Sequence, residues 1–362
     1  SLPKDRKTLK EKLLLSIDSF QKYVSKPQGE LYIFVLEEFK TQKIVGTCNI
    51  ESKIGVHVPF YVYKWVEYQF PNNSKSLYNT YDILEPEDVH NGPSEIGGLY
   101  LDPRYRKKGL GRFLSLSRFM FIAQCPSRFD DIIIAEMRGC SDEKGYSPFW
   151  EEVGKKLVGL SFQEADLLSA TDSHFVHRDY PKVPIPVSLL SEEAQSMIGQ
   201  AHPYTVPALK LLLSEGFELT HNVDLFDVGP KVKVQKKNIR MIQDHKEGVV
   251  DSFLTELKEP DFILSSGTLD SFRACYVPLK CIRKGAVSVP KKVKKLLSIQ
   301  EGDFVSYSPL VPSHDSKDYS MDIKKKRISE DLMDKDLDSS EHFLRRFSTW
   351  YKKVSTTSKI NG

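Results

Sequence analysis

The sequence predicts an α/β fold, in the α+β sense of helices packed on a mixed sheet, followed by a small C-terminal β domain. Strand-like runs of β-branched and aromatic residues recur through the first two thirds of the chain. A strand–turn–helix segment occupies residues 94–124, and the pattern changes after Pro230. We therefore expect a first domain over 1–230, a small β-rich domain over 231–310, and a charged tail over 311–362 that is solvated, partly helical or disordered.

The composition is that of an ordinary globular protein with room for two domains. The chain has 362 residues, of which 40% are hydrophobic and 28% are charged. Its formal net charge is only +3. A dedicated nucleic-acid binder usually carries a strong basic face, so we expect no nucleic-acid partner.

The cysteine count and the lack of long apolar runs indicate a cytoplasmic protein. Five cysteines occur without a C-x-x-C pair, so we expect neither a disulfide scaffold nor a bound metal. No apolar run approaches the ~20 residues of a membrane span, and no secretory signal is apparent. The chain begins at Ser1 rather than at Met, which is consistent with a processed or truncated form.

The first quarter of the chain alternates a helix with strand-like runs. Leu9, Leu13 and Ile17 recur at helical spacing, so a helix is expected from Ser1 to about Val24, with Ser1 as its cap. Two short runs then predict a hairpin, a third run alternates aromatic with polar residues, and an Asn-rich stretch indicates mostly loop. In order these segments are residues 31–36, 44–50, 59–68 and 71–92.

The rest of the chain predicts further strands and short helices around a polar excursion at 169–186. Further strands are expected at 131–136, 217–226, 262–264, 274–279 and 304–307. Helical segments are expected within 141–165, at 191–198 and at 207–214. A basic segment at 291–295 lies between the last strands.

The sharpest motif lies where the strand ending in Leu99, Tyr100 and Leu101 runs through a turn into an apolar helix. The turn has the form Arg106-x-x-Gly109-x-Gly111. Its glycines let the backbone approach a ligand, and the helix start offers unpaired N–H groups and a partial positive charge. Arg106, Lys107 and Lys108 add positive charge around the turn. Together these features predict an anion site suited to a pyrophosphate.

Two familiar phosphate-binding patterns do not match this turn. It has neither the G-x-G-x-x-G of a dinucleotide site nor the Gly-Lys-Ser/Thr of a P-loop. A plain glycine turn with solvated lysines is the structural alternative, but the flanking strand and apolar helix favour a ligand site. The arrangement resembles the CoA-pyrophosphate motif of the GNAT superfamily, and the late Gly216-Phe217 pair fits the same pattern. This resemblance implies a GNAT-like acyltransferase core.

Four blocks extend the resemblance to the arginine N-succinyltransferase family over roughly residues 1–310. They are residues 117–121, 135–139 continuing to 145–150, 199–203 and 225–230. The resemblance implies that succinyl-CoA donates its acyl group to the α-amine of L-arginine, and in some members ornithine, in bacterial arginine catabolism. It also implies that Leu99 contacts the acyl-CoA and that His202 is catalytic.

Acyl transfer from a thioester needs amine deprotonation, oxyanion stabilisation and departure of a thiolate. Leu99 and Tyr100 are the candidates for backbone donors on a splayed strand. The resemblance assigns His202 as proton donor to the thiolate, whereas its chemistry alone also allows a base that acts on the amine. A capping or core histidine is the structural alternative, and Tyr204 is an alternative acid.

A cationic acceptor such as arginine needs a carboxylate for its guanidinium and a donor for its own carboxylate. Glu136 and Arg138 lie beside the end of a predicted buried strand and could serve. An internal ion pair between structural elements is an equally good role for both residues.

Three other functions remain open at this point. The first is a related acyl-CoA-dependent amine N-acyltransferase with a different donor or acceptor. The second is a non-catalytic partner subunit, in an oligomer of identical or different chains. It is favoured by the apparent lack of a strand and helix that the family carries before this chain begins. Nucleic-acid binding through the tail is weaker, because acids such as Asp331 and Asp334 interrupt its basic runs. The run Gly97-Gly98 is richer in glycine than the family leads us to expect.

Overall fold

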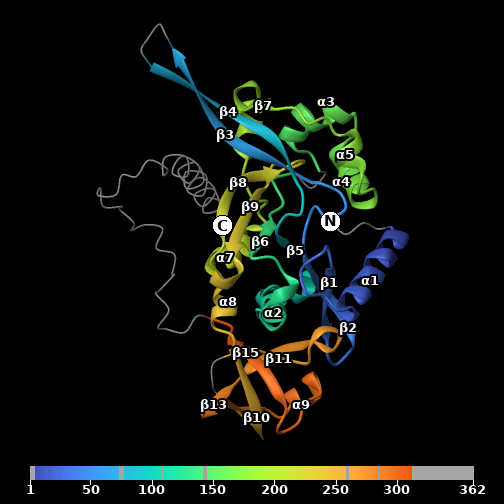
Figure 1. Ribbon diagram of the computed structural model, residues 1–362, viewed down its shortest axis with the longest axis vertical. Coiled ribbons are helices and arrows are strands. Elements are labelled where there is room, and N and C mark those ends of the chain that lie inside the picture. The colour runs from blue at the N-terminus through green and yellow to red at the C-terminus, as the bar shows by residue number, and fades with distance from the viewer. Residues whose placement is uncertain are drawn as a thin grey trace.

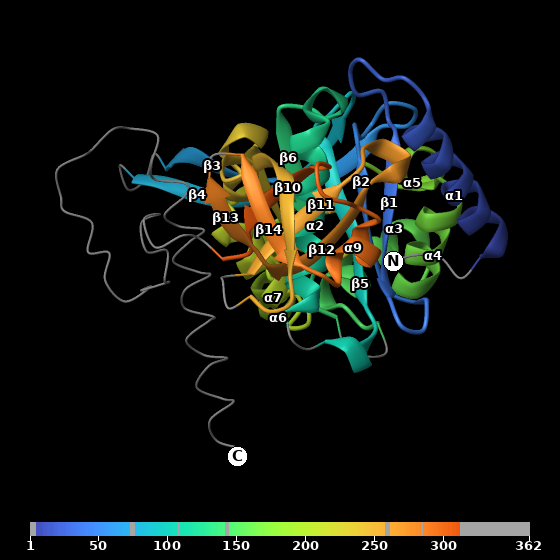
Figure 2. The same ribbon diagram turned by 90° about the horizontal axis from the view of Figure 1, so that it is seen from below.

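The computed structural model describes residues 5–72, 77–106, 109–141, 145–257, 261–283 and 285–311. The expected cap Ser1, the basic residues Lys107 and Lys108, and nearly all of the expected tail lie outside the described residues. Within the described part, a nine-stranded sheet and a six-stranded sheet lie on opposite sides of one buried helix, α2 (Leu110–Gln124) (Figures 1 and 2). The predicted α/β fold with mixed sheets is confirmed.

The larger sheet combines the predicted hairpin with strands from much later in the chain. Most neighbouring strands are antiparallel, and β5 pairs with β6 in parallel. Its strands, in spatial order, are β1 (Leu31–Glu38), β2 (Lys43–Glu51), β5 (Ser94–Leu101), β6 (Ile132–Glu136), β9 (Pro230–Gln235), β8 (Glu218–Asp224), β3 (Phe60–Asn72), β4 (Leu77–Val89) and β7 (Ile185–Pro186).

The smaller sheet is formed by the late part of the chain. Its spatial order is β12 (Arg273–Pro278), β11 (Asp261–Ser266), β15 (Phe304–Pro309), β10 (Lys246–Leu254), β14 (Ala286–Pro290) and β13 (Lys280–Arg283). A separate apolar cluster around Val250, Leu264 and Val287 fills its other face. The predicted division at residue 230 stays a prediction, and the adjacent strand β9 belongs to the larger sheet.

Besides α2, the described residues form a long N-terminal helix and several short ones. These are α1 (Arg6–Gln21), a π-helical turn (Trp150–Gly154), α3 (Lys155–Val158), α4 (Phe162–Thr171), α5 (Phe175–Asp179), α6 (Glu192–Met197), α7 (Val206–Ser214), α8 (Arg240–Gln243) and α9 (Val293–Leu297). None of the helices described here is long and apolar enough to cross a membrane.

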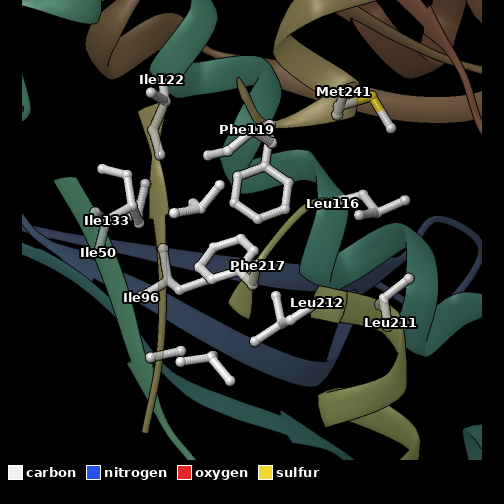
Figure 3. Close-up of a cluster of buried hydrophobic side chains, with 14 of the residues drawn as sticks. Ile50, Ile96, Leu116, Phe119, Ile122, Ile133, Leu211, Leu212, Phe217 and Met241 are labelled. Atoms are coloured by element: carbon white, nitrogen blue, oxygen red, sulfur yellow. The ribbon is translucent and has the colours of Figure 1, made fainter. Parts of the chain in front are cut away.

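Helix α2 is apolar on nearly every side because both sheets cover it. All residues from Phe113 to Ile122 are buried. Figure 3 shows Phe119 and Leu116 pointing toward Phe217 and the leucines of α7. The same cluster includes Ile263 and Leu310 of the smaller sheet region. A helix that is enclosed in this way needs no polar face toward solvent, which explains why apolar residues occur on all its sides, with Ser115, Ser117 and Arg118 buried among them.

Helix α1 covers the outer edge of β1. The Ser16 and Ser19 hydroxyls accept hydrogen bonds from the backbone N–H groups of Ile33 and Leu31, at 2.9 Å and 3.1 Å. These contacts satisfy donors that an edge strand would otherwise present to solvent. The helix starts later than predicted, because Asp5 accepts from the Thr8 backbone N–H and caps it.

Two regions differ from the sequence prediction. Residues 71–92 were expected to be mostly loop, but 77–89 form β4, which pairs with β3 along its whole length. The resulting arm projects from the body of the molecule (Figure 1). Regular cross-strand pairing outweighs the turn-forming asparagines here. Residues 169–186 were expected to be an irregular excursion, but they include the end of α4 and all of α5.

Candidate active site

The predicted anion site lies at the open N-terminus of α2. Gly109 is the N-cap residue and has φ = 75°, a left-handed conformation that favours glycine. No side chain caps this helix, so its first N–H groups are open to a ligand. Gly111 lies in the first turn of the helix. Arg106 is exposed, and its Nε donates to the Leu101 carbonyl at 3.0 Å.

The strand leading into this turn separates from its parallel neighbour. β5 pairs with β6 only at Ser94 and Glu95. On the other side, Gly98 and Leu99 together lie opposite one residue of β2, which makes a β-bulge, and Gly98 has φ = 59°. Beyond Glu95, the β6-facing backbone groups of β5 are therefore not used by the sheet.

The three predicted strand residues differ in exposure. Leu99 and Tyr100 are 37% and 53% exposed, which is unusual for large apolar side chains at the centre of a sheet. Leu101 is buried. An extended ligand lying along β5 would therefore meet two apolar side chains and free backbone groups.

His202 lies beside the extension of β6. Gly139 and Ala201 form an isolated bridge, and the His202 backbone N–H donates to the Arg138 carbonyl at 2.8 Å. The imidazole Nδ1 accepts from the Tyr204 backbone N–H at 3.2 Å. An Nδ1 that accepts carries no hydrogen, so the ring hydrogen lies on Nε2, which is left as a donor. The half-buried ring packs at 5.1 Å from the Tyr204 ring.

The topology brings these elements to one edge of the sheet. Because β5 and β6 are parallel, their carboxyl ends point the same way. The α2 N-terminus follows β5, while Arg138 and the bridged His202 segment follow β6. Figure 3 shows α7, which begins just after His202, packed next to α2 through Leu211 and Leu212.

A pocket of about 400 Å³ opens at the same end of β6. Its charged walls carry four carboxylates and one guanidinium, and its other walls combine four aromatic side chains with aliphatic ones. Its lining includes Glu136, Arg138, Asp166, Asp224, Asp227 and Phe162. An excess of acidic groups around a cavity of this size suits a small cationic molecule.

The two predicted acceptor residues both line this pocket. Glu136 forms an ion pair with Lys231, whose side chain is buried and also lies over the Phe60 ring at 4.3 Å. The structural alternative, an internal ion pair, is therefore present for Glu136, and its carboxylate still lines the pocket. Burial raises the pKa of Glu136, although the charge of Lys231 opposes this. Arg138 is exposed, with its guanidinium 5.9 Å from the Phe162 ring.

Sequence reasoning did not single out the three aspartates of the pocket, Asp166, Asp224 and Asp227. The Asp224 carboxylate accepts from the backbone N–H groups of Phe226 and Asp227, at 2.7 Å and 2.9 Å. Burial, followed by the charge of Asp224, raises the pKa of Asp227 well above its usual range. Asp227 lies within one of the four blocks that carry the family resemblance, so the signal was present. Within the described residues, no group of three or more His, Cys, Asp or Glu side chains is placed to hold a metal ion.

Comparison with known proteins identifies relatives of this chain over most of its length. The family model for the arginine N-succinyltransferase beta subunit matches residues 1–241, and the model for its C-terminal domain matches residues 249–309. The arginine N-succinyltransferase of Enterobacter sp. (strain 638) is 38% identical over 279 residues, which is 76% of this chain and 81% of the relative. That of Escherichia coli O6:H1 is 39% identical over 244 residues, 67% of this chain and 71% of the relative.

A solved structure agrees with these matches. Subunit AI of the arginine/ornithine succinyltransferase from Pseudomonas aeruginosa is 30% identical to this chain and superimposes with a TM-score of 0.79. The match covers 86% of this chain and 91% of that one, so both sheets share one architecture with a known acyltransferase subunit. The chain belongs to the arginine N-succinyltransferase family of acyltransferases.

Proposed function

We propose that this chain transfers the succinyl group of succinyl-CoA to the α-amine of L-arginine, with ornithine as a second acceptor. The observation that carries the proposal is one sheet edge with two complementary sites. An open helix N-terminus suits a pyrophosphate, and an acidic pocket beside it suits a cationic amino acid. The names of the relatives supply the identity of the donor and of the acceptors.

On the donor side, some residues bind the pyrophosphate of CoA and others bind its pantetheine arm. Gly109, Gly111 and the first N–H groups of α2 hold the pyrophosphate, helped by Arg106. The backbone of Leu99 and Tyr100 binds the pantetheine arm and the thioester carbonyl, while Leu101 anchors the strand in the core. The prediction for Lys107 falls outside the described residues.

On the acceptor side, the pocket discriminates by charge. Asp224, Asp227 and Glu136 surround the guanidinium, and Arg138 binds the carboxylate of the amino acid. The aromatic wall at Phe162 packs against the aliphatic part of the substrate. A neutral or acidic amino acid would place no cation beside Asp224 and Asp227, so it should bind poorly.

His202 acts when the thiolate leaves. The amine attacks the thioester carbonyl, a C–N bond forms, and the C–S bond then breaks. The Nε2–H of His202 donates a hydrogen bond to the departing sulfur. The nitrogen of the tetrahedral intermediate carries two hydrogens, and it loses one of them as the thiol forms. The products are the N-succinyl amino acid and free CoA.

Assembly and location belong to the same proposal. The matching family models and the matching solved structure are named as subunits, so we propose that this chain works in an oligomer of identical or related chains. All five cysteines are free, as is usual in a reducing compartment, and this supports a cytoplasmic location.

The test is a thiol-release assay with purified protein. We expect CoA release that depends on both succinyl-CoA and arginine, with ornithine as a slower acceptor and with little release from acetyl-CoA. Mass spectrometry should identify N-succinylarginine. A protein that binds CoA but releases none with either amino acid would contradict the proposal.

A further inference from the structure

A buried arginine lies between α2 and the bulge of β5. Arg118 is only 2% exposed, although the other buried residues of its helix are apolar side chains and serines. Its Nε donates to the Ser115 carbonyl at 3.0 Å, and its Nη2 donates to the Ser115 hydroxyl at 2.8 Å. Its Nη1 reaches beyond the helix and donates to the Gly97 carbonyl of β5 at 3.2 Å. The guanidinium therefore connects α2 to the residue that immediately precedes the bulge.

This cation has no counter-ion within the described residues. No carboxylate there acts on Arg118, and its three hydrogen bonds all go to uncharged oxygen atoms. Burial raises the pKa of the neighbouring Cys48 thiol to about 11, so that group is neutral as well. A guanidinium stays protonated, and a buried charge without a partner of opposite sign costs stability. A well-packed apolar side chain would suit the core better, so the contact with β5 is what explains the arginine.

A second contact ties the other strand at the bulge to the same side of α2. Cys48 is the single β2 residue that lies opposite the two residues of the bulge. Its Sγ donates to the Leu114 carbonyl at 3.4 Å. Leu114 and Arg118 are four residues apart on the helix, so both contacts come from one face of α2. The helix therefore holds the bulge through β5 and through β2.

The bulge is also covered on the other face of the sheet. A Cβ at Gly98 would lie 2.9 Å from Asn49 Nδ2 and 3.0 Å from Asn49 Cγ. Asn49 alternates along β2 with Cys48 and Ile50, which are buried on the α2 side, so its amide lies on the opposite face. The backbone at Gly98 therefore lies between the Asn49 amide on one face and Arg118 on the other.

The two halves of the proposed donor site lie on the two elements that Arg118 joins. In that proposal the N-terminus of α2 holds the pyrophosphate, and the backbone of β5 after the bulge holds the pantetheine arm and the thioester carbonyl. One CoA molecule spans both halves. The position of β5 relative to α2 therefore decides where the thioester lies once the pyrophosphate is bound. An error of about 1 Å in such a position can lower a rate by about 10²-fold.

We propose that Arg118 is a positioning residue, which holds the bulge of β5 against α2 so that the backbone N–H groups of Leu99 and Tyr100 meet the thioester of a bound acyl-CoA. This inference rests on the proposed function. Without the guanidinium, the Gly97 carbonyl loses its link to the helix and β5 can shift relative to α2. The pyrophosphate turn is unaffected, because Gly109 lies more than two helical turns before Arg118.

The test compares Arg118→Met and Arg118→Lys with the wild-type protein, by calorimetry and by the thiol-release assay. Methionine fills the space without a donor. We expect Arg118→Met to lower kcat about 10–100-fold, and to weaken CoA binding about 3–10-fold as contacts to the pantetheine arm are lost. Its affinity for adenosine 3′-phosphate 5′-diphosphate, the part of CoA that ends at the pyrophosphate, should change by less than about twofold.

Arg118→Lys is the conservative variant and should recover part of kcat. Its ammonium group can still donate to the Gly97 carbonyl, but it lacks the planar fork that also binds Ser115. We therefore expect its kcat and its affinity for CoA to lie between those of Arg118→Met and the wild type. The affinity for the adenosine fragment should be the same in all three proteins.

Arg128→Met is the matched control, because Arg128 is also a buried arginine whose hydrogen bonds go to uncharged oxygens. These are the Ser19 and Lys22 carbonyls and the Tyr32 hydroxyl, none of which belongs to the proposed donor site. We expect Arg128→Met to lower the urea midpoint of unfolding and to leave kcat and both affinities unchanged. Arg118→Met, in contrast, should keep a midpoint close to that of the wild type.

Two results would overturn the assignment. One is an Arg118→Met protein with wild-type kcat and wild-type affinities. The other is an equal loss of affinity for CoA and for its adenosine fragment, which would place the defect in the pyrophosphate turn or in the fold as a whole. If Arg118→Met does not fold, the same two outcomes for Arg118→Lys decide the question. A wild-type protein that binds CoA but is silent with arginine would overturn the proposed function, and the two affinities would still test the role of Arg118.

Discussion

The two faces of the nine-stranded sheet are made by alternating residues of the same strands, yet they differ completely in charge. Toward α2, the central strands present Ile50, Ile96 and Ile133, all buried. Toward the pocket, the adjacent positions carry Glu51, Glu95 and other charged groups. One-residue steps along a strand therefore separate a closely packed core from a charged surface.

The difference shows how stability and chemistry are divided in this molecule. Burial of apolar surface on the α2 face stabilises the folded state by about 25 cal/mol per Å². This contribution does not depend on a bound ligand. The charged face works against folding, because burial raises the pKa of Glu51, Glu95 and Glu136. Such groups are common at functional sites, where a perturbed proton affinity is useful. The following predictions test this division, from the largest effect to the smallest.

At the edge shared by the donor and acceptor sites, His202→Ala should lower kcat by about 10²–10⁴-fold, because the departing thiolate loses its hydrogen-bond donor. CoA binding, measured by calorimetry, should stay close to wild type. Tyr204→Phe is the control, since it keeps the backbone N–H that binds Nδ1 and removes only the hydroxyl. A larger loss in Tyr204→Phe than in His202→Ala would make Tyr204 the acid.

On the apolar face, Phe119→Ala should lower the free energy of unfolding by about 3–5 kcal/mol, because it leaves a cavity between α2 and Phe217. Urea titration followed by circular dichroism measures the change. Leu189→Ala, at a side chain that is 79% exposed, should alter stability by less than about 0.5 kcal/mol. Equal effects of the two substitutions would mean that α2 is not the centre of the core.

At the donor site, Gly109→Val should weaken CoA binding about 10–100-fold. Valine is strained at φ = 75°, and its side chain would project into space that no other residue occupies within 4 Å. Gly159→Val provides a matched strain, because Gly159 has φ = 73° and equally open surroundings at the end of α3. Calorimetry should find the affinity loss in the first variant and nearly normal affinity in the second.

The sequence singled out the residues of the proposed donor site more completely than those that line the proposed acceptor pocket, and the reason is physical. The donor site is local: the strand, the glycine turn and α2 follow one another within residues 94–124, so spacing alone reveals them. The acceptor pocket is assembled from β6, α4 and the turn after β8, which are far apart in the chain. The sequence around Asp224 and Asp166 has no motif that would mark either residue as part of a binding site. Glu136 and Arg138 were found because they adjoin a recognisable strand.

The arm formed by β3 and β4 shows a second limit of sequence reasoning. Its second strand has an asparagine and a proline, which are typical of loops, and it becomes a strand because it pairs with β3. The strand β9 was also missed, although it pairs on both sides at the centre of the larger sheet. Its lysines alternate with buried valines, and one of them, Lys231, is buried only because Glu136 lies opposite. Such a strand can be predicted only when the strand that it pairs with is known.

The smallest predicted effect tests whether the charged face costs stability. The pKa of Glu51 is raised from 4.5 to about 7, chiefly by burial, so the folded protein holds this proton more tightly than the unfolded chain. Below about pH 4.5 both states are protonated and no penalty exists. As pH rises through 7 the folded state must ionise a half-buried carboxyl, and stability is lost. After allowance for solvent screening, the free energy of unfolding of Glu51→Gln should therefore exceed that of the wild type by on the order of 1–2 kcal/mol at about pH 8. At about pH 4.5 the two proteins should be almost equally stable. Urea titrations at the two pH values measure the gain. A variant with the same advantage at both would show that the charge of Glu51 carries no penalty, and that the two faces of the sheet stabilise the fold alike.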